Sequence, residues 1–82
     1  MEGFWMKDLI KVLAQALVEH PDDIEITETE NENGVVVISL KVSSEDVGKV
    51  IGKQGRTARA LRTLAAAGGA KMQKRIMLEI IE

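Results

Sequence analysis

The sequence predicts a single small α+β domain, in which helices cover one face of a three-stranded mixed sheet. Its 82 residues are enough for one domain and no more. Apolar residues with helical spacing, then two strand-like runs, then two helical segments and a β-branched end predict the order α-β-β-α-α-β. Because each expected helix has one apolar stripe and the strands share one apolar face, the helices should pack on one side of the sheet.

The first helix is expected over residues 4–18. Its apolar residues recur at spacings of three and four, as on one side of an amphipathic helix: Leu9, Val12, Leu13, Ala16 and Leu17. Pro21 disfavours helical geometry at the residue before it, so the helix should end there with His20 as its C-terminal cap.

Two strands should follow as an antiparallel hairpin. Residues 24–29 alternate isoleucine with polar side chains, and residues 35–42 place Val36, Ile38, Leu40 and Val42 on one face. Between them, the Asn33-Gly34 step is typical of the left-handed conformations of a hairpin turn.

The second half should contain two helices and a last strand. Ser43 is expected to cap a short helix that has Asp46 in its first turn and ends at Gly52. The next helix should run from about Arg56 to Ala67, with Gly68-Gly69 as its exit. Its apolar residues are Ala58, Leu61, Leu64 and Ala65. Residues 75–81 are rich in β-branched side chains and predict the third strand.

Charge is strongly segregated along the chain, although the net charge is only −2. Residues 1–34 carry two bases against nine acids, whereas residues 35–82 carry nine bases against four acids. Residues 47–75 contain eight bases and no acid, which favours a polyanion-binding face over an ordinary solvated helix surface.

Within this basic stretch, Gly52-Lys53-Gln54-Gly55 separates the two expected helices. Two glycines three residues apart commonly form only a cap and a turn, so the pattern by itself is weak. The flanking helices and the surrounding cations favour phosphate recognition, because glycine lets a phosphate approach the main chain near a helix N-terminus.

The run from Val50 to Arg56, within this order of elements, resembles the bacterial type II KH domain. The segments around it are similar to the small stand-alone KH proteins of the KhpA type, and the resemblance covers essentially the whole chain, 1–82. It implies a non-catalytic, cytoplasmic single-stranded RNA-binding protein, with a role as an RNA chaperone or post-transcriptional regulator. It also implies a GxxG loop that clamps about four nucleotides, with the bases in an apolar groove.

Carried over by position, the resemblance implies nine RNA-binding residues: Lys49, Ile51, Gly52, Lys53, Gln54, Gly55, Arg56, Arg59 and Arg62. Leu61 should help Ile51 to support the groove. Thr57 and Ala58 are small where KH proteins often have a larger aliphatic residue, which leaves the base preference open. RNA and single-stranded DNA also remain alternatives for the strand that is bound.

The resemblance further suggests a homodimer or a complex with a Jag/KhpB-type KH protein. The alternative function is therefore a protein–protein adaptor that uses the KH surface to bind a partner. Phe4 and Trp5 are the only aromatic residues and the candidate contacts, although a terminal tryptophan more often covers the core.

Other functions lack the residues that they need. With no Cys or Tyr and one His, the chain offers no catalytic constellation, and no cofactor or metal is expected. Residues 48–53 resemble a phosphate-binding loop of nucleotide hydrolases, but they have three residues between the glycines and Gln54 after the lysine. The expected strands have no aromatic residue for base stacking, and no apolar run is long enough to cross a membrane.

Overall fold

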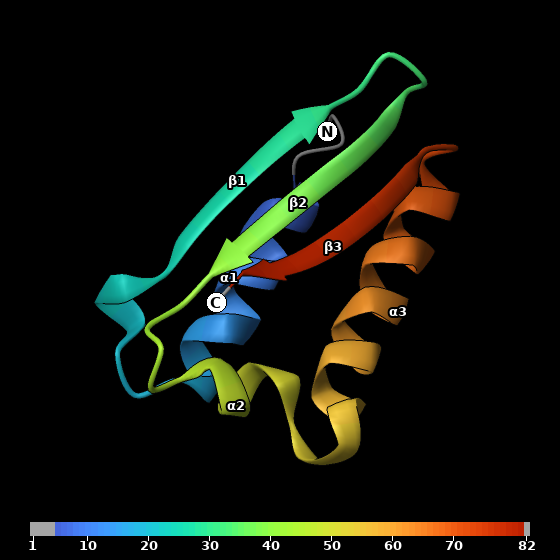
Figure 1. Ribbon diagram of the computed structural model, residues 1–82. Coiled ribbons are helices and arrows are strands. Elements are labelled where there is room, and N and C mark those ends of the chain that lie inside the picture. Colours follow the sequence, from blue (N-terminus) through green and yellow to red (C-terminus); the bar gives the residue numbers. More distant parts are fainter. Residues whose placement is uncertain (1–4, 82) are drawn as a thin grey trace.

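The structure is a computed structural model that describes residues 5–81. Its elements follow the predicted order α-β-β-α-α-β (Figure 1). They are α1 (Trp5–Leu17), β1 (Glu25–Glu30), β2 (Val35–Lys41), α2 (Val47–Ile51), α3 (Arg56–Lys71) and β3 (Arg75–Ile81). Single 3₁₀ turns at Pro21–Asp23 and Lys53–Gly55 lie before β1 and between α2 and α3.

The sheet has the strand order β1-β2-β3 and is mixed, as predicted. β1 pairs antiparallel with β2, and β2 pairs in parallel with β3 through the crossover of α2 and α3. In the β1–β2 turn, the Asn31 side chain accepts hydrogen bonds from the backbone N–H groups of Asn33 and Val35. Gly34 has a positive φ of 78° and Asn33 does not, so the turn uses one left-handed residue instead of the expected two.

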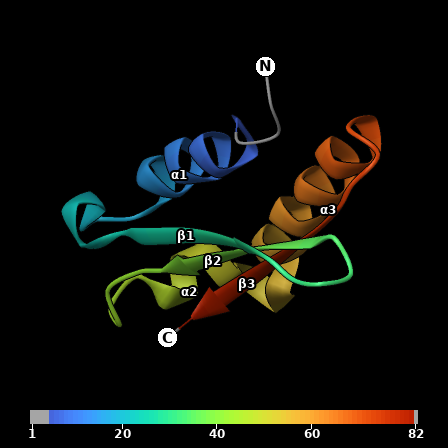
Figure 2. The ribbon, with the colours of Figure 1, turned by 90° about the horizontal axis from the view of Figure 1, so that it is seen from above.

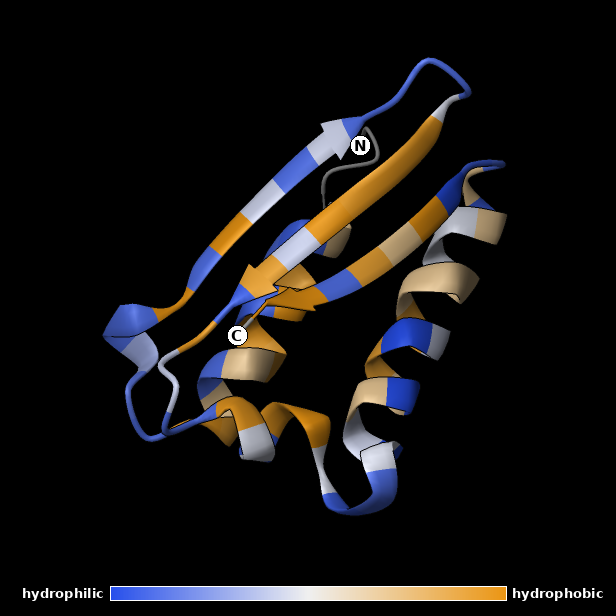
Figure 3. Ribbon diagram, in the orientation of Figure 1, coloured by the Kyte–Doolittle hydropathy of each residue, from blue (hydrophilic) through white to orange (hydrophobic). Residues whose placement is uncertain are grey.

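The helices cover one face of the sheet and leave the other face open (Figure 2). α1 lies behind the sheet, α3 lies alongside β3, and α2 lies below the end of β2 in Figure 1. The alternating residues of β2 and β3 that face the helices form the centre of the core: Val36, Ile38, Leu40, Ile76 and Leu78. In Figure 3 these two strands are mostly apolar, whereas β1 and the hairpin turn are mostly polar.

The buried side of α1 differs from the predicted stripe. Met6, Ile10 and Ala14 are fully buried, whereas Val12 is 60% exposed. Leu9 and Leu13 pack at the margin of the core. The buried side is rotated by about a quarter of a turn from the predicted stripe. α1 is apolar on two adjacent sides, and only contact with the sheet selects one of them.

The C-terminal end of α3 also differs from the prediction. The helix continues through Gly68 and Gly69, which are buried, and Leu64 is 44% exposed. A Cβ atom on Gly69 would lie 2.6 Å from the Lys74 carbonyl oxygen, so this glycine allows α3 to pack closely against the start of β3. The exit is Gln73, which has a φ of 60°.

His20 does not act as the predicted cap of α1, and Asp46, expected in the first turn of α2, lies at the N-cap position that was predicted for Ser43. α1 ends at Leu17, and the buried Asp46 carboxylate accepts hydrogen bonds from the backbone N–H groups of Glu19 and His20 at 3.2 and 2.9 Å. His20 Nδ1 lies 3.0 Å from the same carboxylate and must donate, since a carboxylate only accepts. The pair therefore holds the start of α2 against the chain that leaves α1.

Candidate nucleic-acid interface

The loop between α2 and α3 contains three residues with positive φ. Gly52 ends α2 with a φ of 78° and a ψ of 170°, a conformation open essentially to glycine alone. Gln54 and Gly55 follow with φ values of 57° and 73°. The Gly55 N–H donates to the Gly52 carbonyl oxygen at 3.1 Å, so the loop is a tight, hydrogen-bonded turn.

The two glycines are required for different reasons. A Cβ atom on Gly52 would collide with the Thr57 side chain, and it would lie 2.9 Å from the Thr57 backbone nitrogen. A Cβ atom on Gly55 would meet nothing within 4 Å. Gly52 therefore allows internal packing, and the expectation that both glycines open the main chain to a phosphate holds sterically only at Gly55.

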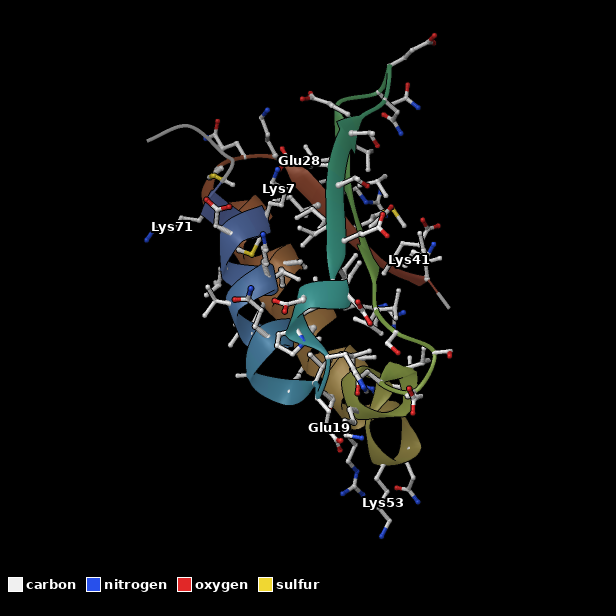
Figure 4. The ribbon with its side chains drawn as sticks, turned by 90° about the vertical axis from the view of Figure 1, so that its left-hand side faces the viewer. Lys7, Glu19, Glu28, Lys41, Lys53 and Lys71 are labelled. Carbon is white, nitrogen blue, oxygen red and sulfur yellow. The ribbon has the colours of Figure 1, made fainter. Side chains whose placement is uncertain are left out.

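Cations surround the loop and follow one side of α3. Lys53 extends from the end of the molecule at the loop (Figure 4), and Arg56, Arg59 and Arg62 follow at intervals of three residues. The first turn of α3 contains no acid. Cations at the positive end of a helix dipole are unfavourable for stability, and a bound anion would relieve this repulsion.

A groove begins at the loop and continues along α3 to β3. Its first part is a hollow of about 530 Å³ lined by Gln54, Gly55, Arg59, Arg62, Thr63 and Ala66. Its second part, about 620 Å³, shares Arg62 and Ala66 and is completed by Ala70 and residues 73–78. No acidic residue lines either part among the residues that the structure describes.

Arg62 crosses this groove at the junction of its two parts. Its Nε donates to the Leu78 carbonyl oxygen at 3.4 Å, and β3 is an edge strand of the sheet. The remaining guanidinium donors of Arg62 are not used in any bond to the described residues. Arg62 is therefore held where the two parts of the groove adjoin.

The structure brings together most of the predicted site residues. Gln54, Gly55, Arg59 and Arg62 line the groove. Lys53 is exposed at the loop, and Arg56 is held beside it by a hydrogen bond of 3.1 Å to the Gln54 side chain.

Two predicted binding residues, Lys49 and Ile51, and the predicted supporting residue Leu61 do not line the groove. Lys49 Nζ forms an ion pair with Glu19 at 3.2 Å and lines neither part of the groove. Ile51 is half-buried at the end of α2, and Leu61 is in the hydrophobic core. Phe4 and the side chain of Trp5 lie outside the described residues.

The prediction of the site omitted its far end. Gln73, Lys74, Arg75 and Met77 line the second part of the groove together with the apolar side chains of Ile76 and Leu78. The two cations belong to the basic stretch that the sequence shows, but only the packing of α3 against β3 places them in line with the loop.

An α-β-β-α-α-β domain, with a GxxG loop that opens onto a groove between a helix and a sheet edge, is a KH domain. The family model described as "KhpA/KhpB, KH domain" matches residues 7–80. The chain belongs to this KhpA/KhpB family.

Several bacterial relatives are similar over almost their whole length. The RNA-binding protein KhpA of Caldanaerobacter subterraneus is 50% identical over 93% of this chain and 100% of its own. The proteins of the same name from Aquifex aeolicus and Listeria monocytogenes are each 51% identical over 94% of this chain, and over 96% and 100% of their own lengths. A crystal structure of Aquifex aeolicus Era has the same fold, with a TM-score of 0.61 at 17% identity, over 94% of this chain and 29% of Era.

The helices of residues 5–81 include none with the length and apolar character that crossing a bilayer requires.

Proposed function

We propose that this protein is a non-catalytic, cytoplasmic single-stranded RNA-binding protein. The observation that carries the proposal is the continuous groove, which begins at the GxxG loop, is lined by Arg59 and Arg62 and contains no acid among the described residues. Its relatives named RNA-binding protein KhpA support the same conclusion.

The loop would hold the sugar-phosphate backbone. A phosphate can approach Gly55 because the space above its Cα is open, and the positive end of the α3 helix dipole adjoins it. Lys53 and Arg56 add positive charge on either side of Gln54. The contacts are to the backbone, so they position the strand without reading its sequence.

The bases would lie in the groove against aliphatic side chains. Ala66, Ala70, Ile76 and Leu78 give this wall its apolar character, and none of the described lining residues is aromatic. Stacking on aromatic rings contributes about 1–3 kcal/mol per base in other proteins, so a wall without rings gives lower affinity and little sequence selectivity. Weak, unselective binding suits an RNA chaperone or a post-transcriptional regulator with many targets.

A charge reversal at the loop tests the clamp. The double substitution Lys53→Asp with Gln54→Asp should weaken binding of a short oligouridine at least about tenfold, because two negative charges would face the phosphates. The fold should survive, since both side chains are exposed and aspartate tolerates the left-handed conformation of residue 54. The measurement is fluorescence anisotropy, with thermal unfolding in parallel.

The matched control is Lys11→Asp with Gln15→Asp on the exposed side of α1. It replaces the same two residue types and changes the net charge equally, and neither residue lines the groove. Equal affinities of the loop variant and the wild type would remove the clamp from the proposal. Equal losses in the loop variant and the control would mean that net charge alone determines binding.

A second candidate function is docking of another KH protein, either a second copy of this chain or a KhpB-type partner. Val12 on α1 and Leu64 on α3 are exposed apolar side chains outside the groove, and they favour such a contact. Neither side chain lines the groove, so a partner bound at either one is compatible with RNA binding. A second domain would raise the affinity for a longer RNA through avidity.

A further inference from the structure

We propose that the turn between α3 and β3 is a second phosphate-binding point for the same RNA strand, with Lys74 and Arg75 as its ligands. This inference rests on the proposed function, because it assigns the far end of the groove that begins at the GxxG loop. It predicts that the protein contacts more nucleotides than the loop alone can clamp.

The first argument is the continuity of the groove. Arg62 and Ala66 line both of its parts, and the second part ends at Gln73, Lys74 and Arg75. α3 has 16 residues, so the turn lies about 24 Å from the loop along the helix axis. A strand that leaves the loop along α3 therefore passes the turn at the other end of the same helix.

The second argument is the rigidity of the turn. The Lys74 N–H donates to the Gly69 carbonyl oxygen at 2.7 Å, and the Gln73 N–H donates to the Ala70 carbonyl oxygen at 3.1 Å. With Gln73 in the left-handed conformation, these bonds form a Schellman motif. The backbone that carries the two cations is fixed before any ligand binds, which lowers the ordering cost of binding.

The third argument is the availability of the charges. Arg75 forms no ion pair within the described part of the chain. Lys74 Nζ lies 3.5 Å from Glu30 Oε1, but both side chains are about half exposed. Such surface ion pairs contribute about 0–1 kcal/mol to stability, so a phosphate can displace Glu30 from Lys74. Lys71 does not line the groove, and it extends from the side of the molecule on which α1 lies (Figure 4).

The test compares two lengths of oligouridine, one of about four nucleotides, which the loop can clamp, and one twice as long. A longer RNA also binds in more registers, which raises affinity without adding phosphate contacts. The slope of log affinity against log salt is free of this effect, since it counts the phosphates that are neutralised. Two added single-strand contacts should make the slope for the longer RNA steeper by about 1.4.

The variant Lys74→Gln with Arg75→Gln should remove this difference in slope and weaken the longer RNA about tenfold, with the shorter RNA within about twofold of wild type. Glu30→Gln should do the opposite and bind the longer RNA about twofold more tightly, because Lys74 is released. The control Lys11→Gln with Lys41→Gln removes two exposed cations that do not line the groove, and it should keep the wild-type slopes.

The outcomes separate this inference from the proposed function. Equal wild-type slopes for both lengths would overturn the second phosphate site and leave the clamp intact. Equal losses of affinity for both lengths in the Lys74–Arg75 variant would also overturn the second phosphate site. The two cations would then act through the long-range electrostatic field of the protein and not through direct contact with a phosphate. A wild-type protein that binds neither length would contradict the proposed function itself.

Discussion

The glycines of the loop region show how one residue type can meet three different demands. Gly52 lacks a Cβ because Thr57 fills that space, and Gly55 needs only its left-handed backbone conformation. Gly48 lies inside α2 with an ordinary φ and open space beside it. Stability measurements on alanine variants can distinguish these three roles.

We expect Gly52→Ala to destabilise the fold by about 3 kcal/mol, since backbone strain and a collision add. Gly55→Ala should destabilise the fold by about 1 kcal/mol, because alanine is strained in the left-handed conformation but its Cβ meets no neighbour. Gly48→Ala should stabilise by about 0.5 kcal/mol, because alanine is the better residue in a helix. The measurement is urea unfolding of each variant, and similar costs at positions 52 and 55 would show that Thr57 moves aside.

The pair of the partly exposed His20 and the buried Asp46 makes stability depend on pH. The hydrogen bond to Asp46 raises the pKa of His20 above its ordinary value of 6.5, helped by the charges of Asp46, Glu45 and Asp23 and opposed by burial. Burial raises the pKa of Asp46, but the N–H bonds from Glu19 and His20 and the bond from the His20 ring outweigh it. The net pKa of Asp46 is therefore below its ordinary value of 3.8.

The signs of the two shifts define a pH window. The contribution of His20 to the free energy of unfolding is complete below pH 6.5, and it is lost as the pH rises through the raised pKa of His20 in the folded state. The contribution of Asp46 is present above pH 3.8 and is lost as the pH falls through its lowered pKa. The pair should therefore stabilise the fold most between these two values.

The check is the pH dependence of unfolding for wild type and His20→Gln. The glutamine keeps the backbone N–H that Asp46 binds and removes only the ring. The difference in unfolding free energy between the two proteins should be largest in the window and should shrink toward pH 8. A difference that does not change with pH would mean that the ring acts through packing and not through its charge.

α3 is the element whose two ends determine the groove. Its N-terminus adjoins the loop, and its C-terminal turn packs against β3 through Gly69. The contact of Gly69 with Lys74 and Ile76 sets how closely α3 approaches the strand. The width of the groove between α3 and β3 therefore depends on a residue far from the loop.

Two substitutions at this end should have opposite effects on stability. Gly69→Ala should destabilise by about 2 kcal/mol, because its Cβ would lie 2.6 Å from a backbone oxygen that cannot easily move. Gln73→Gly should stabilise by about 0.5 kcal/mol, because glycine adopts the left-handed conformation without strain. Thermal unfolding measures both, and a stable Gly69→Ala protein would show that α3 can shift away from β3.

Over the whole molecule, the two edges of the sheet differ in charge. The β1 edge carries Glu25, Glu28 and Glu30, whereas the β3 edge begins with Arg75 and adjoins the groove. Glu28 points toward the side that the helices cover, and its Oε1 is buried without a hydrogen bond. An inward-pointing acid on an edge strand discourages pairing with a strand of another molecule.

The separation of acids at the β1 edge from cations along the groove predicts a moderate salt dependence of RNA binding. If three or four phosphates are neutralised at the loop end of the groove, log affinity for a short RNA should fall against log salt with a slope of about −2 to −3. The measurement is a salt titration with the shorter oligouridine. A flat response would favour the adaptor function, in which the KH surface binds a protein partner.

Much of the fold could be predicted because local patterns determine it. The alternation of β2, the β-branched residues of β3 and the Gly52 stop of α2 each depend on neighbours in the sequence. The predictions were wrong where two local solutions competed. Gly68-Gly69 is an ordinary helix exit by sequence, but contact with β3 makes it a close-packing point inside α3.

The sequence by itself determined the order of elements, the GxxG loop and the segregation of charge, because these depend on residue types and short spacings. Only the tertiary structure decided which cations share a surface: it turned Lys49 toward Glu19, set Arg62 across the groove and brought Lys74 and Arg75 into line with the loop. The physical reason is that the groove lies between α3 and β3, and its width and direction depend on packing between segments that local patterns do not relate.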